Sequence, residues 1–322
     1  MKIHNPNVAD NAVNQEHRQL GLPPAEASTR GEAAHPLLDL AAWFTFAVLV
    51  ALTLYLAGRL LFTGNLQAAG DALRSVPFWS AVAVGFFAQA IDGALGMAYG
   101  VTATTFLLGA GASPASASAS VHIAEIFTTG FSGVSHLKYG NVNRQLFTRL
   151  LVPGILGAVL GTIVITQLEG EVMRPYVTAY LLIMGLYILS KAFRKFQARA
   201  EEPRHVGKLA AFGGFVDAAG GGGWGPVVTS TLVGSGRDPR TTIGSVNFAE
   251  FFITVATAAS FSLLAESGTW VLVAGLVVGG LFAAPFAALL CRRLRARTLL
   301  ILVGTLISAI SAYGLGRLFL FA

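Results

Sequence analysis

The sequence predicts an all-α polytopic membrane protein. We expect two inverted repeats, each a broken or re-entrant helical hairpin plus three transmembrane helices, with one extra N-terminal transmembrane helix. Three observations predict this fold. Of the 322 residues, 54% are hydrophobic and only 12% are charged, whereas about a quarter are charged in soluble domains. The apolar runs are continuous, which favours spanning helices over a membrane β-barrel. Two glycine-interrupted apolar segments also recur along the chain.

The N-terminal part of the chain divides into a tail and a helix. Residues 1–37 are polar, contain four prolines and have no apolar periodicity, so we expect a disordered cytoplasmic tail. No basic-then-apolar pattern follows Met1, so we do not expect a cleaved signal peptide. Residues 38–63 are long enough to form the extra transmembrane helix.

Two transport repeats follow, at 77–195 and 207–322. Each begins with a glycine-interrupted apolar block and continues with three apolar spans. In chain order these segments are 77–110, 114–137, 150–168, 172–193, 209–234, 239–264, 270–290 and 299–321. Single glycines within the spans, such as Gly154, Gly157 and Gly161, are expected to allow close helix packing.

The two interrupted blocks align with each other without a gap. The residues from Asp92 to Gly100 match those from Asp217 to Gly225. Further pairs in this alignment are Gly96/Gly221, Thr104/Thr229, Ser120/Ser245 and Glu125/Glu250. Helix packing accounts for matched small residues, but not for acids paired within apolar segments.

The charged loops predict how the repeats lie in the membrane. The loops at 138–149, 191–208 and 291–297 are basic, so we expect all three to be cytoplasmic. Block 209–234 must then enter and leave the membrane on one side, and block 77–110 does so from the other side. We therefore attribute the net charge of +6 to loops that orient the protein in the membrane, and no nucleic-acid partner is expected. The competing interpretation makes each block one kinked span and the repeats parallel.

Four consecutive glycines, from Gly220 to Gly223, break the second block. A break at membrane depth is tolerated where protein or a water-filled cavity surrounds it. Proline is favoured at the first position of a helix, so we expect a half-helix at 226–234 whose N-terminus points at the break and attracts an anion. The predicted substrate-binding residues are Gly96, Tyr99, Gly100, Thr102, Thr104, Gly221, Gly222, Gly223, Trp224, Gly225, Thr229 and Ser230.

Acidic residues near the breaks are candidates for ion coupling. Asp92 and Asp217 flank the breaks and either cap the free N–H groups there or bind a coupling ion. Glu125 lies on the following helix, three residues after His122, and a His–Glu pair can relay protons. The predicted coupling residues are Asp92, Asp217, His122, Glu125, Asn247 and Glu250, with a proton or sodium as the ion. No metal is expected, because His122 has no repeat counterpart and no cysteine lies nearby.

The segments GGGGWGPVVTSTLVGSG and GALGMAYGVTATTFLLGAG resemble the TauE/SafE sulfite-exporter family, also called the toluene-sulfonate uptake permease family. Each is followed by proline and a helix with a central serine, Ser120 or Ser245. The stretch HLKYGNV at 136–142 is also similar to the family's turn after its third helix. The resemblance covers about residues 77–320. It implies secondary transport of sulfite, sulfonates or related organosulfur anions across the bacterial inner membrane.

The leading hypothesis is therefore an ion-coupled transporter for a small anion, without catalytic residues or cofactor. Its partners would be the substrate, the coupling ion and the lipid bilayer, with the N-terminus in the cytoplasm. One alternative is an intramembrane enzyme with an Asp92/Asp217 dyad, which requires the two hairpin tips to touch. A second alternative is an anion channel. Substrate, transport direction and oligomeric state are left open.

Overall fold

The computed structural model describes residues 36–62, 70–71, 73–193, 205–235, 239–264, 270–293 and 296–320. The predicted tail at 1–37 lies outside these residues except for its last two, which begin the first helix. The helical elements are α2 (Pro36–Phe62), α4 (Val76–Leu95), α5 (Tyr99–Gly109), α6 (Pro114–Lys138), α7 (Arg144–Gln167), α8 (Gly170–Lys191), α9 (Val206–Gly220), the π-helical turn η1 (Gly225–Thr229), α10 (Ser230–Gly234), α11 (Pro239–Leu264), α12 (Trp270–Arg293) and α13 (Ala296–Leu320). The all-α prediction is confirmed for the described residues.

Five helices in the described part of the chain are long and apolar enough to cross a membrane. These candidate spans are 36–55 in α2, 144–167 in α7, 170–191 in α8, 241–264 in α11 and 300–318 in α13. Large apolar side chains such as Trp43, Tyr176 and Phe282 are exposed on the outside of the bundle. Such a surface is stable in hydrocarbon and unfavourable in water, so the prediction of a membrane protein is supported.

Helix α6 is 25 residues long but is not among the candidate spans. Its hydropathy is lowered by small and polar side chains, including His122 and Glu125. Every residue from Ala117 to Gly130 is nevertheless buried. The predicted span at 114–137 is therefore a polar helix enclosed by its neighbours, and not a helix that faces lipid over most of its length.

The ends of the helices have local causes in the sequence. Ser75, Ser113 and Asn143 precede α4, α6 and α7, and each side-chain oxygen accepts a hydrogen bond from a backbone N–H in the first turn. Proline occupies one of the first two positions of both α4 and α6. The side-chain oxygens accept from N–H groups that the helix itself leaves unpaired, and proline removes one such donor because it has no backbone N–H.

Glycine faces bring two pairs of helices into close contact. Helix α9 packs on α7, where Gly157 and Gly161 face the backbone of Ala211 and Phe215. Helix α4 packs on α12 in a similar way, with Gly279 against the backbone of α4. A side chain at these positions would meet backbone atoms, so the glycines permit the packing. The predicted packing role of the single glycines in α7 is confirmed.

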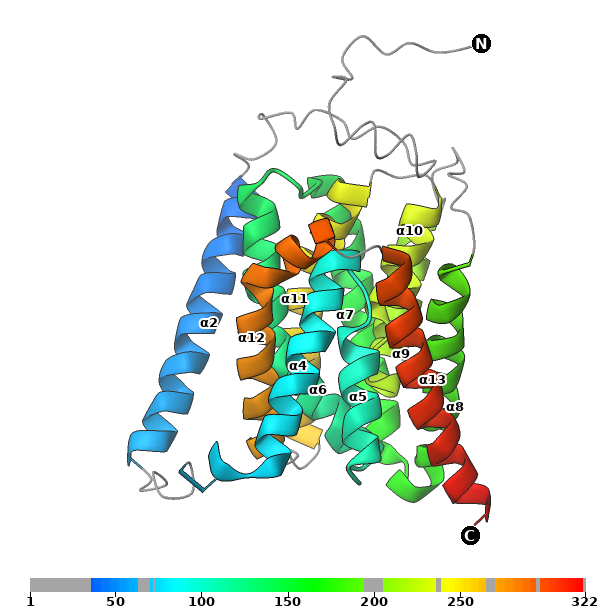
Figure 1. The fold of residues 1–322 in the computed structure, drawn as a ribbon. Coiled ribbons are helices and arrows are strands. Elements are labelled where there is room, and N and C mark those ends of the chain that lie inside the picture. The colour runs from blue at the N-terminus through cyan, green and yellow to red at the C-terminus, as the bar shows by residue number, and fades with distance from the viewer. Residues whose placement is uncertain are drawn as a thin grey trace, which may run out of the picture.

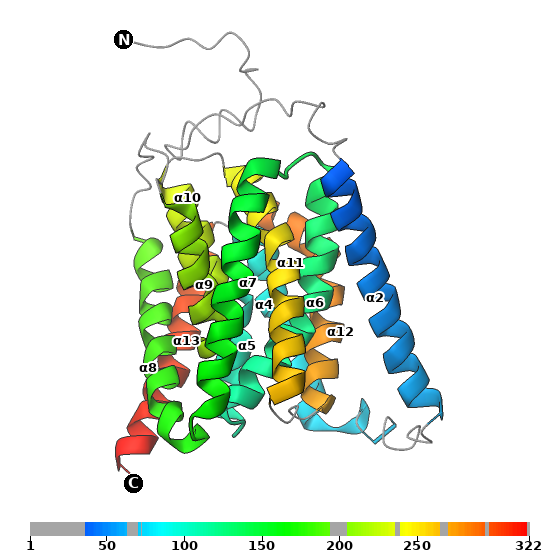
Figure 2. The ribbon, with the colours of Figure 1, turned by 180° about the vertical axis from the view of Figure 1, so that it is seen from behind.

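Figures 1 and 2 show how the broken segments run. Helix α4 begins, and α5 ends, at the end of the bundle where α2 ends. Helix α9 begins, and α10 ends, at the opposite end. Each broken segment therefore returns to the end from which it came. Helix α2 lies at the edge of the bundle and contacts α6, where the Leu49 side chain reaches Gly130.

Candidate functional site

Glycines in left-handed backbone conformation end the first half of each broken segment. Helix α4 stops at Gly96, with φ of 64°, and α9 stops at the equivalent Gly221, with φ of 70°. Gly222 follows with φ of 143°. These conformations are accessible to glycine at little cost and strained for other residues. The second half-segment starts at Gly225 as η1 and continues as α10, close to the predicted half-helix at 226–234.

The two breaks lie directly against each other. A Cβ atom added to Gly100 would lie 2.7 Å from the Cα of Gly222, and one added to Gly225 would lie 2.7 Å from the Cα of Met97. The hydroxyl of Thr104 donates to the carbonyl of Gly221, across the same contact. The N-terminus of each second half-segment thus meets the break of the other segment. Residues far apart in sequence form one buried centre.

Asp217 connects the second break to α6. Its Oδ1 accepts hydrogen bonds from the backbone N–H groups of Gly223 at 2.7 Å and Trp224 at 2.9 Å. Its Oδ2 lies 3.2 Å from Nε2 of His122. The carboxylate therefore caps its own break and also pairs with a buried imidazole. These partners offset part of the cost of burying a polar side chain.

The Nδ1 atom of His122 lies 2.7 Å from the carbonyl oxygen of Ser118. That contact places the Nδ1 proton, because a carbonyl only accepts hydrogen bonds. The Ser118 hydroxyl donates at 2.6 Å to the carbonyl of Ala218 in α9. His122 is thus held on both sides between α6 and α9. The sequence suggested Glu125 as its partner, whereas the structure pairs it with Asp217.

Two further carboxyl groups lie at the N-terminus of α5. Asp92 accepts a 3.4 Å hydrogen bond from the backbone N–H of Tyr99. An oxygen of Glu125 lies 3.1 Å from the position of a Cβ at Gly100, and its other oxygen is buried without a hydrogen-bond partner among the described residues. Negative groups are stabilised at helix N-termini. The protein's own carboxyl groups therefore occupy the positive ends that were predicted to attract a substrate anion.

The remaining polar candidates are buried near this centre. Glu250 is 8% exposed. The Nδ2 of Asn247 donates to Ser132 at 3.0 Å, so this residue bonds to α6 and not to a carboxylate. The hydroxyls of Thr102 and Thr229 have no hydrogen-bond partner among the described residues. The Ser230 hydroxyl lies 3.7 Å from the sulfur of Met97.

The two aromatic candidates are fully buried and hydrogen-bonded to neighbouring helices. The indole N–H of Trp224 donates to the carbonyl of Val246 at 3.3 Å, and its ring packs beside Gly154. The Tyr99 hydroxyl donates to the carbonyl of Leu276 at 3.2 Å. These hydrogen bonds connect Trp224, the residue before η1, to α11, and Tyr99, the first residue of α5, to α12.

Two residues of this centre were missed by sequence reasoning. Ser118 fixes His122, as described above, and its spacing of four residues on α6 was the available signal. Tyr180 of α8 donates its hydroxyl to the carbonyl of Gly222 at 2.7 Å. No sequence pattern connects Tyr180 to the glycine run, because the contact depends on how α8 packs.

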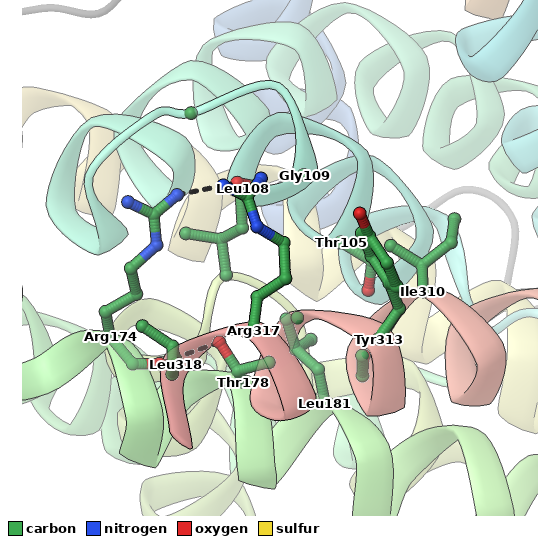
Figure 3. A pocket seen from close by; sticks show the side chains of 13 residues that line it. Thr105, Leu108, Gly109, Arg174, Thr178, Leu181, Ile310, Tyr313, Arg317 and Leu318 are labelled. Atoms are coloured by element: carbon green, nitrogen blue, oxygen red, sulfur yellow. Dashed lines mark hydrogen bonds between the residues drawn. The ribbon is translucent and has the colours of Figure 1, made fainter. Parts of the chain in front are cut away.

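A separate cavity lies beside α5, between α8 and α13 (Figure 3). Its volume is about 460 Å³, and it is lined by residues of all three helices. None of the predicted substrate-binding or coupling residues lines it. Within the described residues, no group of three or more His, Cys, Asp or Glu side chains is placed to hold a metal ion.

Comparison with known proteins gives two matches to this chain. Residues 81–314 match the family described as "Sulfite exporter TauE/SafE". The chain is also similar to a Bacillus subtilis (strain 168) protein described as "Probable membrane transporter protein YtnM", with 44% identity over 239 residues, which are 71% of this chain and 79% of the relative. No solved structure matches the chain.

Proposed function

This chain belongs to the TauE/SafE sulfite exporter family of membrane transporters, and we propose that it moves sulfite, a sulfonate or a related organosulfur anion by coupling it to protons. The observation that carries the proposal is the contact between two helix breaks around the His122–Asp217 pair. Buried ionisable groups at helix breaks are characteristic of transport pathways.

The proposed mechanism is a competition for the N–H groups at the second break. Asp217 as a carboxylate occupies the donors of Gly223 and Trp224. A proton delivered to the His122–Asp217 pair weakens these two hydrogen bonds, because a neutral carboxyl group is a weaker acceptor than a carboxylate. The substrate anion then takes the vacated donors. Release of the proton on the other side of the membrane returns Asp217 to its place and expels the anion.

We further propose that the two repeats are inverted. The packing of α4 on α12 has its counterpart in α9 on α7, and α6 packs on its counterpart α11. The contact of Gly100 with Gly222 is likewise repeated by Gly225 with Met97. Inverted repeats allow one centre to face each side of the membrane in turn. The two halves exchange conformations between the inward-facing and the outward-facing state.

The basic loops support one orientation of the protein in a bacterial inner membrane. Helices α6, α8 and α12 end, and α7, α9 and α13 begin, at the end of the bundle where α2 begins (Figures 1 and 2). The basic stretches of the sequence lie between these helix ends along the chain, so we assign this end to the cytoplasm. The broken segment α4–α5 then enters from the outside and α9–α10 from the cytoplasm.

Membership in a transporter family decides against the intramembrane-enzyme alternative. The hairpin tips do touch, as an Asp92/Asp217 dyad requires, but Asp217 is paired with His122. An anion channel remains the second candidate, because a buried polar centre serves either mechanism. Concentrative uptake separates the two, since a channel cannot drive an anion against its electrochemical gradient.

Flux in proteoliposomes tests the proposal. The protein is reconstituted, and uptake of labelled sulfite and of methanesulfonate is measured with and without an imposed proton gradient. We expect uptake above equilibrium when the gradient is present. Asp217→Asn should abolish the response to the gradient but keep anion exchange, whereas Asp39→Asn, an exposed acid on α2, should behave as the unmodified protein. Absence of flux for every sulfur oxyanion, or a full gradient response in Asp217→Asn, would contradict the proposal.

A further inference from the structure

The cavity beside α5 is formed by three helix faces. Its lining on α13 comes from Ile310, Ser311, Tyr313, Gly314, Arg317 and Leu318, which recur at spacings of three or four residues and so share one face. Helix α8 contributes Arg174, Thr178 and Leu181, and the end of α5 contributes Thr105, Leu108 and Gly109, with Gly111 after it. A volume of about 460 Å³ lies within the range of small-molecule sites.

Two arginines converge on this cavity. Figure 3 shows the side chains of Arg174 and Arg317 extending toward Leu108 and Gly109 at the end of α5. One guanidinium nitrogen of Arg174 donates to the carbonyl of Leu108 at 2.8 Å, which holds the group in place and leaves its other donors available. Guanidinium groups bind oxyanions with paired hydrogen bonds.

A buried hydroxyl adds a second, independent observation. Ser311 lines the cavity and is 2% exposed, and its hydroxyl has no hydrogen-bond partner among the described residues. Buried hydroxyls are nearly always paired, so an unpaired one at a cavity is available to bond to a ligand there. Gly314 keeps the space open, since a Cβ there would lie 3.3 Å from the Thr178 side chain.

The orientation signal does not explain the two arginines. The cavity lies near the C-terminal end of α13, at the end of the bundle away from the basic connections. Arginines are not needed there as cytoplasmic markers.

We propose that this cavity binds an oxyanion head group, such as a sulfonate or phosphate, attached to a short apolar tail. The arginines and Ser311 hold the head group, and Leu108, Leu181 and Ile310 contact the tail. For a soluble sulfonate the cavity is an entry site next to the half-helix that leads to the central breaks. That role in entry rests on the function proposed above, whereas the binding chemistry does not.

Isothermal titration of the purified protein with butanesulfonate tests the site, with butyrate and sulfate as comparisons. We expect butanesulfonate to bind more tightly than either, because it has both the head group and the tail. Arg317→Gln should raise the dissociation constant about tenfold or more, because a charge-assisted hydrogen bond is lost. Ser311→Ala should weaken binding less, and Arg149→Gln, an exposed arginine near the other end, should have no effect.

A second variant and a lipid comparison complete the experiment. Gly314→Leu fills the cavity and retains both arginines, so it should also weaken binding if Arg317→Gln does not fold. In nanodiscs, competition by phosphatidylglycerol but not phosphatidylcholine would assign the site to a lipid phosphate, and no competition would assign it to a soluble sulfonate. Binding that is absent, or unchanged in Arg317→Gln and Gly314→Leu, overturns the inference. Flux in proteoliposomes is a separate readout, so the failure of either proposal is recognisable on its own.

Discussion

Replacement of Gly222 by alanine tests whether the two breaks meet as the structure has them. Gly222 has φ of 143°, and an added Cβ would meet the carbonyl carbon of Gly100 and the backbone nitrogen of Val101. Backbone strain of this kind costs about 1–3 kcal/mol. Overpacking against backbone atoms, which cannot rotate away, costs about 1–3 kcal/mol more. We therefore expect Gly222→Ala to lose about 2–6 kcal/mol of stability.

Two other glycines separate these contributions. Gly111 also has a positive φ, of 100°, but an added Cβ meets nothing within 4 Å, so Gly111→Ala should show the strain alone. Gly316 lies inside α13 with ordinary φ and open space. Alanine is favoured over glycine in a helix by about 0.5–1 kcal/mol, so Gly316→Ala should be neutral or slightly stabilising.

Thermal unfolding in detergent, followed by tryptophan fluorescence, ranks the three variants. A loss of about 2–6 kcal/mol lowers the midpoint by roughly 5–20 °C in a chain of this size. We expect the midpoint to fall most in Gly222→Ala, less in Gly111→Ala and not at all in Gly316→Ala. If Gly222→Ala unfolds at the same temperature as Gly111→Ala, the breaks do not touch and the central site is wrongly assembled.

Three further predictions follow from the same structure. His122→Ala should cost about 3–5 kcal/mol, because it leaves a buried charge on Asp217 without its partner; the double variant with Asp217→Asn should recover part of this loss in the same unfolding assay. Thr104→Val should cost about 1 kcal/mol through the hydrogen bond lost at the second break, and a midpoint equal to that of the unmodified protein would show that the bond is dispensable. Single cysteines at Lys138 and Glu169, in a chain whose native cysteine is replaced, should react with an impermeant thiol reagent from the cytoplasmic and the outer side, respectively; labelling of both from one side would refute the assigned orientation.

Much of the helical framework was predictable because it depends on local properties. Long apolar runs predicted α8 and α11 to within two residues of their observed ends, whereas α7 begins six residues before the predicted span at 150–168. Four successive glycines predicted the second break, since they cannot sustain a helix, and the internal repeat predicted the first. Helix α6 shows where this reasoning fails: its polar residues lower its hydropathy, yet its neighbours enclose it. Burial by neighbouring helices is not encoded in the composition of one segment.

The sequence alone determined that this chain is helical, that it suits a membrane and that two acid-flanked breaks occur in equivalent positions. Each of these properties depends on residues close together along the chain. Only the tertiary structure decided that the breaks touch, that His122 pairs with Asp217 and not with Glu125, and that Tyr180 reaches Gly222. Those contacts join separate helices, and the packing that brings the helices together depends on many side chains at once.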